Sequence, residues 1–216
     1  MRITAIERLK RKRRYEVRID HVLVVPLSPE VLAQANLRTG QEISDAQIEA
    51  IEEAEARHSA LASALRLLAY RPRSEKEMRQ ALNRRKVRPD LVDATVNRLC
   101  ELRLLDDREF ARSYVDLKDR TSPRSRRMLR SELLSRGLDA ASLDEPLSGV
   151  DDEDAAYRAG AKKARSLSNT EYADFRRRLG DYLLRRGFNH EVARGTVRRL
   201  WEEQRGESAL DEDDVP

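Results

Sequence analysis

The sequence has little of what cross-linked or metal-dependent proteins rely on. Cys100 is the only cysteine among 216 residues, so an intramolecular disulfide is excluded, and its apolar helical context predicts a small buried thiol. The three histidines, His21, His58 and His190, are far apart and have no carboxylate or thiol at metal-ligand spacing, which predicts that no metal is bound. Glycine and proline are scarce, with 8 and 7 residues, and this favours helices over turn-rich sheets.

Long apolar runs are missing as well. No stretch of about 18 uninterrupted apolar residues occurs, which argues against a membrane-spanning helix. The first residues, Met1-Arg2-Ile3-Thr4, do not begin an apolar run of the length found in signal peptides. We therefore expect a cytoplasmic protein.

The motifs of common catalytic sites are also missing. The sequence contains no GxxxxGK phosphate-binding loop, no GxSxG, no HExxH and no GxGxxG that follows a strand. The acidic run from Asp151 to Asp154 lacks the alternating ligands and the glycine of a calcium loop, so it is predicted to cap a helix, as is Asp106-Asp107. We expect a protein that is not an enzyme and has no cofactor.

Charged residues make up 38% of the chain, and their distribution is uneven. The formal net charge is +4, but the last ten residues carry five of the 39 acids and no Lys or Arg. Residues 1 to 206 therefore carry 43 Lys and Arg against 34 Asp and Glu, a charge of +9. A basic body with an acidic tail indicates an anionic partner, nucleic acid first, although solvated arginine-rich helix faces would give the same totals.

The first part of the chain is predicted to form a small β-containing head. Apolar and polar residues alternate at 3–5 and again at 15–19, on either side of the basic run at 10–14. This pattern predicts a hairpin with a basic turn. Residues 22–25 are a candidate third strand. Ser28 is expected to cap a short helix that stops near Gly40.

Helical periodicity begins after the head. The expected helix starts are marked by three capping boxes and one proline of a first turn: Ser44-x-x-Gln47, Ser74-x-x-Glu77, Asp106-x-x-Glu109 and Pro89. The first of these helices is expected to end before Pro72, because proline disrupts a helix interior.

A short pattern recurs three times along the helical part. Residues 82–87, 133–138 and 183–188 each begin with a leucine and lie 51 and then 50 residues apart. Gly137 and Gly187 fall where a helix needs a left-handed residue after its end, and Lys86 occupies this place in the first copy. One helical turn before each leading leucine stands another apolar residue: Met78, Leu129 and Leu179.

These repeats predict a mainly α protein of three tandem three-helix repeats in a curved array, preceded by the β-hairpin-containing head. The predicted segments are the head at 1–43, helical repeats at 44–105, 106–149 and 150–205, and a disordered acidic tail at 206–216. The second helix of the middle repeat is expected to open at Ser122-Pro123, and its third helix, at 140–147, is expected to be short.

Arginine recurs around the second helix of each repeat. Guanidinium groups fork onto phosphates and carboxylates, so recurrent arginines are candidates to line a shared groove for an anionic partner; the alternative is a solvated face paired with neighbouring acids. The candidates are Arg71, Arg73, Arg84 and Arg85, then Arg124, Arg126, Arg127 and Arg130, then Arg176, Arg177 and Arg178, and Arg185 and Arg186 recur in the third repeat as well. Five tyrosines at apolar helix positions are expected in the core: Tyr70, Tyr114, Tyr157, Tyr172 and Tyr182.

Two stretches of the chain resemble the signature segments of the RecX family. They are residues 99–115 (LCELRLLDDREFARSYV) and 130–138 (RSELLSRGL), and with the repeat spacing the resemblance covers residues 57 to 204. The head is similar to that of some members at residues 14–17 (RYEV), 27–28 (LS) and 37–40 (LRTG). Lys86, Asp20-His21 in place of a glycine turn, and the acidic tail depart from the family pattern.

The resemblance implies a regulatory protein of homologous recombination, DNA repair and the SOS response. Its implied partner is the RecA recombinase filament, whose growth, ATP hydrolysis, strand exchange and co-protease action it would inhibit or tune. DNA, as a single strand, would be contacted weakly or indirectly by a monomer. The alternatives are a helical DNA-binding architectural protein without a recombinase partner and, last, an enzyme.

Deleting residues 207–216 is expected to tighten DNA binding more at low salt than at high salt. The five acids of this segment would compete with phosphates for the basic helices, and salt screens both interactions. Binding titrations of the full and shortened chains over a salt series measure the effect, and equal affinities at low salt would contradict autoinhibition by the tail.

Overall fold

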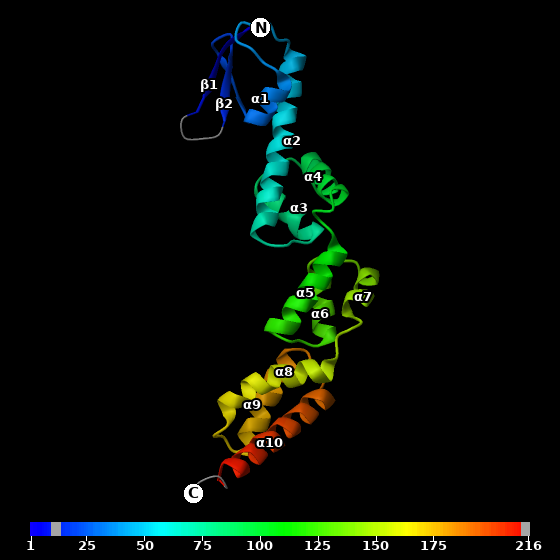
Figure 1. Ribbon diagram of the computed structural model, residues 1–216. Coiled ribbons are helices and arrows are strands. Elements are labelled where there is room, and N and C mark those ends of the chain that lie inside the picture. Colours follow the sequence, from blue (N-terminus) through cyan, green and yellow to red (C-terminus); the bar gives the residue numbers. More distant parts are fainter. Residues whose placement is uncertain (10–13, 213–216) are drawn as a thin grey trace. The chain divides into compact units, whose positions relative to one another are not determined.

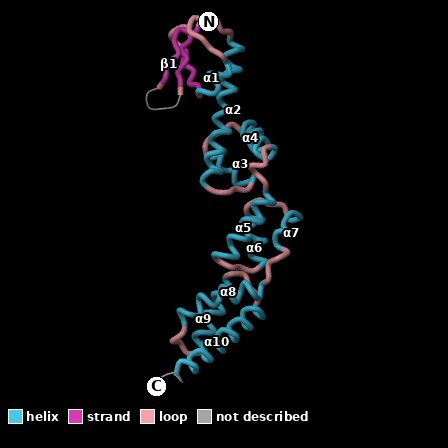
Figure 2. The backbone as a smooth tube through the Cα atoms, viewed as in Figure 1, coloured by secondary structure: helices cyan, strands magenta, loops and turns pink. Residues whose placement is uncertain are grey.

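The computed structural model describes the backbone of residues 1–9 and 14–212 and the side chains through Arg205. Within these residues the chain divides into two compact units, 1–105 and 106–216. Strands occur in the head and helices in the rest of the described chain (Figure 2). The mainly helical fold with a small sheet is thus confirmed, whereas most of the expected basic turn, residues 10–13, lies outside the described residues.

The head is a three-stranded antiparallel sheet in the order β1-β2-β3, which confirms the third strand. Its strands are β1 (Ile3–Arg8), β2 (Tyr15–Ile19) and β3 (Leu23–Leu27). The tight connection between β2 and β3 has Asp20 and His21 at its centre, with φ of 46° and 62°. Two consecutive positive φ values match the right-handed twist of a hairpin. Asp20-His21 thus adopts the turn geometry that more often contains a glycine.

A buried carboxylate joins the head to the longest helix. Helix α1 (Pro29–Ala35) is capped by Ser28, and α2 (Asp45–Tyr70) follows it (Figure 1). Glu55 of α2 accepts hydrogen bonds from the backbone N–H of Ser28 at 2.7 Å and from its hydroxyl at 2.8 Å, and it forms an ion pair with Arg14. Because the buried charge has three partners, its desolvation is compensated. Helix α1 ends at Asn36, with φ of 47°, earlier than the expected stop near Gly40.

Three groups of helices follow, each with its own apolar core (Figure 1). In the first, the second half of α2 packs with α3 (Glu75–Arg84) and α4 (Pro89–Glu101). The second contains α5 (Asp107–Thr121), α6 (Arg126–Ser135), the short 3-10 helix η1 (Ala140–Leu143) and α7 (Asp144–Leu147). The third contains α8 (Asp152–Ala164), the 3-10 helix η2 (Arg165–Leu167), α9 (Tyr172–Arg185) and α10 (His190–Glu212). The short third helix of the middle group is as expected.

The helix starts follow the expected caps, with one exception. Ser44 forms the complete capping box with Gln47, and Ser74 and Asp106 accept from the backbone at their helix starts. The exception is α6, which was expected to open at Ser122-Pro123. Ser122 instead ends α5, because a residue before proline is driven out of the helical conformation, and Ser125 caps α6.

The three repeat turns share one backbone geometry. The residue after each second helix has a positive φ: 59° at Lys86, 92° at Gly137 and 87° at Gly187. In each turn the next residue donates to a carbonyl five residues back, as from Leu138 to Leu133 at 3.3 Å, which is the Schellman pattern. Lys86 adopts this conformation with a side chain, at a cost of about 1–2 kcal/mol.

Helix α10 continues to Glu212 and so includes the first residues of the segment expected to be disordered, 206–216. Glutamate, alanine and leucine, which dominate residues 207–212, are good helix formers, so the periodic α10 can extend through them. Disorder stays a prediction for residues 213–216, which lie outside the described residues.

Replacing Gly187 with Ala is expected to lower the free energy of unfolding by about 2–5 kcal/mol, since a positive φ and overpacking both cost energy. A Cβ at Gly187 would lie 2.6 Å from Ser125 Oγ and 2.7 Å from Met128 Cβ. Urea unfolding followed by circular dichroism measures the change. In the control, Gly180→Ala in α9, the Cβ meets nothing within 4 Å and should stabilise by about 0.5–1 kcal/mol. A Gly187→Ala midpoint equal to that of the unsubstituted chain would contradict the close approach.

Candidate functional site

The arginines of the first group gather around α3. Arg71 forms an ion pair with Glu77 at 2.6 Å, and Arg85 donates to the hydroxyl of Ser63 on α2 at 2.6 Å. Burial lowers the pKa of Arg73, and the positive charges of Arg71, Arg84 and Arg85 lower it further. Such mutual effects show that the four candidates of this group form one positively charged cluster.

Within that cluster the side chains differ in how many donors remain available. Arg73 donates through Nε to the carbonyl of Leu67 at 3.4 Å, a weak contact. Arg84 is exposed and, among the described residues, has no hydrogen bond or ion pair. Arg84 is therefore the candidate of this group with the most unused donors.

The arginines of the middle group are committed to contacts inside their own unit. Arg126 donates to the carbonyl of Val150 at 2.6 Å, and Arg130 forms an ion pair with Asp144 at 2.7 Å. As expected, these two side chains lie on one face of α6, but both guanidinium groups donate hydrogen bonds to the segment 140–150 of the same unit. The other two candidates pair with Glu132 and with the carbonyl of Gly187: Arg124 and Arg127.

The arginines of the third group are exposed on α9. Arg177 forms an ion pair with Asp174 at 3.0 Å, and the guanidinium of Arg176 lies 5.9 Å from the ring centre of Tyr172. Arg178 has no hydrogen bond or ion pair among the described residues. The structure thus divides the candidate arginines into those that hold the fold together and those that keep free donors.

The prediction that all five tyrosines lie in the core is wrong for Tyr70, which is 85% exposed, and for Tyr172, which is 41% exposed. Helix α2 extends three residues beyond Leu67, its last buried residue. Tyr70 is the final residue of the helix and lies next to Arg71 in the chain. In the sequence, Arg71-Pro72 indicates that the helix ends here, and this places Tyr70 in its last turn, beyond the buried residues. The other three tyrosines are half-buried and lie under cationic side chains: Tyr114, Tyr157 and Tyr182.

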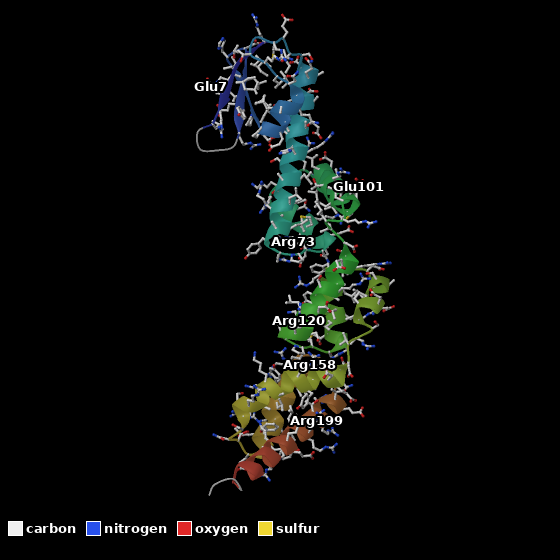
Figure 3. All side chains as sticks on the ribbon, in the orientation of Figure 1. Glu7, Arg73, Glu101, Arg120, Arg158 and Arg199 are labelled. Atoms are coloured by element: carbon white, nitrogen blue, oxygen red, sulfur yellow. The ribbon has the colours of Figure 1, made fainter. Side chains whose placement is uncertain are left out.

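Two arginines join the second and third groups, of which one was among the recurrent arginines of the sequence, Arg186, and one was not, Arg158. Arg158 of α8 donates to both carboxylate oxygens of Asp119 at the end of α5, at 3.1 and 2.5 Å (Figure 3). Arg186, at the end of α9, donates to the hydroxyl of Ser122 at 2.7 Å and to the carbonyl of Pro123 at 3.2 Å. These contacts span between 39 and 64 residues of sequence, so local patterns cannot indicate them.

The described residues contain neither a metal-binding cluster nor a membrane-spanning helix. Among residues 1–9 and 14–212, no three His, Cys, Asp or Glu side chains are grouped so that they could hold a metal ion. No helix in these ranges is both long enough and apolar enough to cross a membrane. The acidic run at 151–154 caps a helix as predicted, because Asp151 accepts from the backbone of Glu153 and Asp154.

Three family models match consecutive parts of the chain. They describe the first three-helix domain of RecX at residues 60–99, the second at 106–145 and the third at 151–197. Each matched range falls on one of the three helix groups of the structure. Together they cover more than half of the chain.

Proteins of known name and structure are similar over most of the chain. The protein named Regulatory protein RecX from Lactobacillus gasseri is 31% identical over 201 residues, which are 92% of this chain and 74% of that protein. Its namesake from Lactobacillus johnsonii is 32% identical over 202 residues, with the same coverage. A crystal structure of regulatory protein RecX has a TM-score of 0.65 at 26% identity and covers 88% of this chain and 96% of its own.

The double substitution Arg126→Ala with Arg130→Ala is expected to destabilise the second unit by about 1–3 kcal/mol, because carbonyls and Asp144 lose charged donors. The matched control is Arg84→Ala with Arg178→Ala, which removes two exposed arginines and should leave stability within about 0.5 kcal/mol. The urea unfolding midpoints of the two double variants are compared with that of the unsubstituted chain. Equal midpoints for the two would mean that Arg126 and Arg130 form only a solvated face.

Proposed function

Because this chain belongs to the RecX family, we propose that it binds the RecA recombinase on DNA and inhibits its ATPase, strand-exchange and co-protease activities. The observation that carries the proposal is the match of all three RecX domains, in order, to the three helix groups. In this role the protein acts in the cytoplasm as a monomer and tunes DNA repair and the SOS response.

The proposed contact residues are the candidate arginines with unused donors, one in each compact unit. Arg84 and Arg178 are exposed and have no internal acceptor among the described residues, so their guanidinium groups remain available for phosphates or acidic side chains of a filament. Arg126 and Arg130 are a poorer choice, because binding a partner would first break their internal contacts. We therefore propose contacts in the first and third groups and not in the middle group.

The protein acts without catalysis of its own in this proposal. Relatives that share the fold are named regulatory proteins, and the sequence has none of the common nucleophile or nucleotide-binding motifs. The effect on DNA metabolism is then exerted through the recombinase alone.

A second candidate function, architectural DNA binding without a recombinase, is favoured by one feature. Tyr70 is 85% exposed and is followed in the chain by Arg71, and an exposed aromatic residue beside a cation is typical of surfaces on which nucleobases stack. The two functions differ in whether the recombinase responds to the protein.

The experiment is the DNA-dependent ATPase of a RecA-type recombinase with substoichiometric additions of this protein. We expect turnover to fall well before the two proteins are equimolar, and we expect no ATP hydrolysis by this protein alone. Arg84→Gln with Arg178→Gln should need more protein for the same inhibition while its circular dichroism stays unchanged, because glutamine is also a good helix former.

Two results would contradict the proposal. Unchanged recombinase turnover at every ratio would contradict the proposed inhibition. DNA binding by this protein under the same conditions would then support the architectural function. Full inhibition by the Arg84→Gln and Arg178→Gln variant would show that these arginines are not the contact surface.

A further inference from the structure

A basic cleft lies within the second unit, between the second and third helix groups. It has a volume of about 420 Å³ and is formed by the end of α5, the middle and end of α8, and the end of α9. Figure 3 labels Arg120 and Arg158, which come from α5 and α8 at this junction. The volume falls in the range of sites that hold small ligands or a segment of a larger one.

The lining of the cleft carries a large excess of positive charge. Its five cations are Arg120, Arg158, Lys162, Lys163 and Arg186, and its one acid is Asp119. Asp119 is already held by Arg158 through both of its oxygens. Four cations are therefore left without a carboxylate inside the cleft.

These four cations retain hydrogen-bond donors. Among the described residues, the side-chain ammonium groups of Lys162 and Lys163 have no hydrogen bond or ion pair. Arg186 uses only Nη1 for Ser122 and Pro123, and Arg120 uses only Nε, for the carbonyl of Asp116 at 3.3 Å. An anion entering the cleft can thus be bound without breaking the contacts that hold the two helix groups together.

Positive charge also surrounds the cleft. Lys118 lies one turn before the end of α5, where burial lowers its pKa and the charges of Arg124, Arg136 and Arg186 lower it further. Since like charges depress the pKa of a lysine, Lys118 adds its positive charge to that of Arg186, which lines the cleft.

The walls of the cleft are held in place before any ligand binds. The backbone N–H of Ser125 donates to the carbonyl of Arg186 at 3.1 Å, and Arg158 bridges α8 to Asp119. Contacts from both sides therefore fix the spacing between α5 and the other two helices. A preformed site loses less conformational entropy on binding than a flexible one.

The chemistry of the lining favours phosphate groups over a protein partner or a nucleobase. Protein interfaces have an apolar centre, but the only apolar lining residues here are Pro123, Ala159 and Tyr182. The ring of Tyr182 is covered by the guanidinium of Arg186 at 4.5 Å, which leaves that face unavailable for base stacking. Contacts in the cleft are thus restricted to the nucleic-acid backbone.

We propose that the cleft between α5, α8 and α9 binds backbone phosphates of a nucleic-acid strand, without preference for its base sequence. Lys162, Lys163, Arg120 and Arg186 supply the positive charge, and Arg158 keeps the cleft open through Asp119. This site needs no recombinase, so it goes beyond the function proposed above and is tested apart from it.

The test is the affinity of the full chain for a labelled single-stranded oligonucleotide, measured by fluorescence anisotropy over a salt series. Lys162→Gln with Lys163→Gln is expected to raise Kd roughly tenfold and to reduce the salt slope by about 1.4, which corresponds to two lost phosphate contacts. Oligonucleotides of different base sequence should be affected equally. Arg120→Gln, whose one hydrogen bond lies within its own helix, should give about half of the change in slope.

The matched control is Arg194→Gln with Arg198→Gln on α10. Both arginines are exposed, neither lines the cleft, and the substitution removes the same two charges. We expect their salt slope to stay close to that of the unsubstituted chain. Circular dichroism and urea midpoints confirm that each variant is folded, and Arg120→Gln serves as the test if the lysine variant is not.

Two outcomes would overturn the proposal. Equal losses for the cleft and control variants would show that net charge alone binds nucleic acid. If the lysine variant kept its oligonucleotide affinity but lost binding to a RecA-type recombinase in the absence of DNA, the cleft would bind an acidic protein surface instead.

Discussion

The left-handed residue that closes the second helix of each group is the constraint on which the helical part depends. It reverses the chain, satisfies two carbonyls of the helix that it ends, and buries the next apolar residue, as with Leu138 and Phe188. In the third group the same turn also accepts contacts from the second, because Ser125 and Arg127 donate to the carbonyls of Arg186 and Gly187. One turn thus terminates a helix and joins two neighbouring groups.

Local features of the fold could be predicted from the sequence, because each depends on residues a few positions apart. The capping box at Ser44, the left-handed turns at Gly137 and Gly187, and the short helix before Ser148 are of this kind. The start of α6 was misplaced because two serines flank Pro123 and both can cap a helix. The proline does not distinguish them, because Ser28 precedes Pro29 and still caps α1.

The roles of the candidate arginines could not be predicted, because their partners are remote in sequence or are backbone carbonyls, which every residue carries. Arg126 binds the carbonyl of Val150, and Arg186 binds Ser122. A run of arginines has the same appearance in sequence whether it holds neighbouring helices together or faces a partner. The structure separates the two uses, and it leaves Lys162 and Lys163, which are not among the candidate arginines, without a carboxylate in the cleft.

Helix α2 is shared by two cores. Its first half contributes Ile48, Ile51 and the buried Glu55 to the head, whereas its second half contributes Ala64 and Leu67 to the first helix group. The head is therefore not an independent domain, because it shares a helix with the first helix group and cannot be gained or lost without changing that helix. A chain that lost residues 1–43 would expose apolar residues and a carboxylate deprived of Ser28 and Arg14 in the middle of a continuous helix. A related chain without a head would need compensating changes inside α2. We therefore expect such chains to carry different residues at Glu55 and at its apolar neighbours.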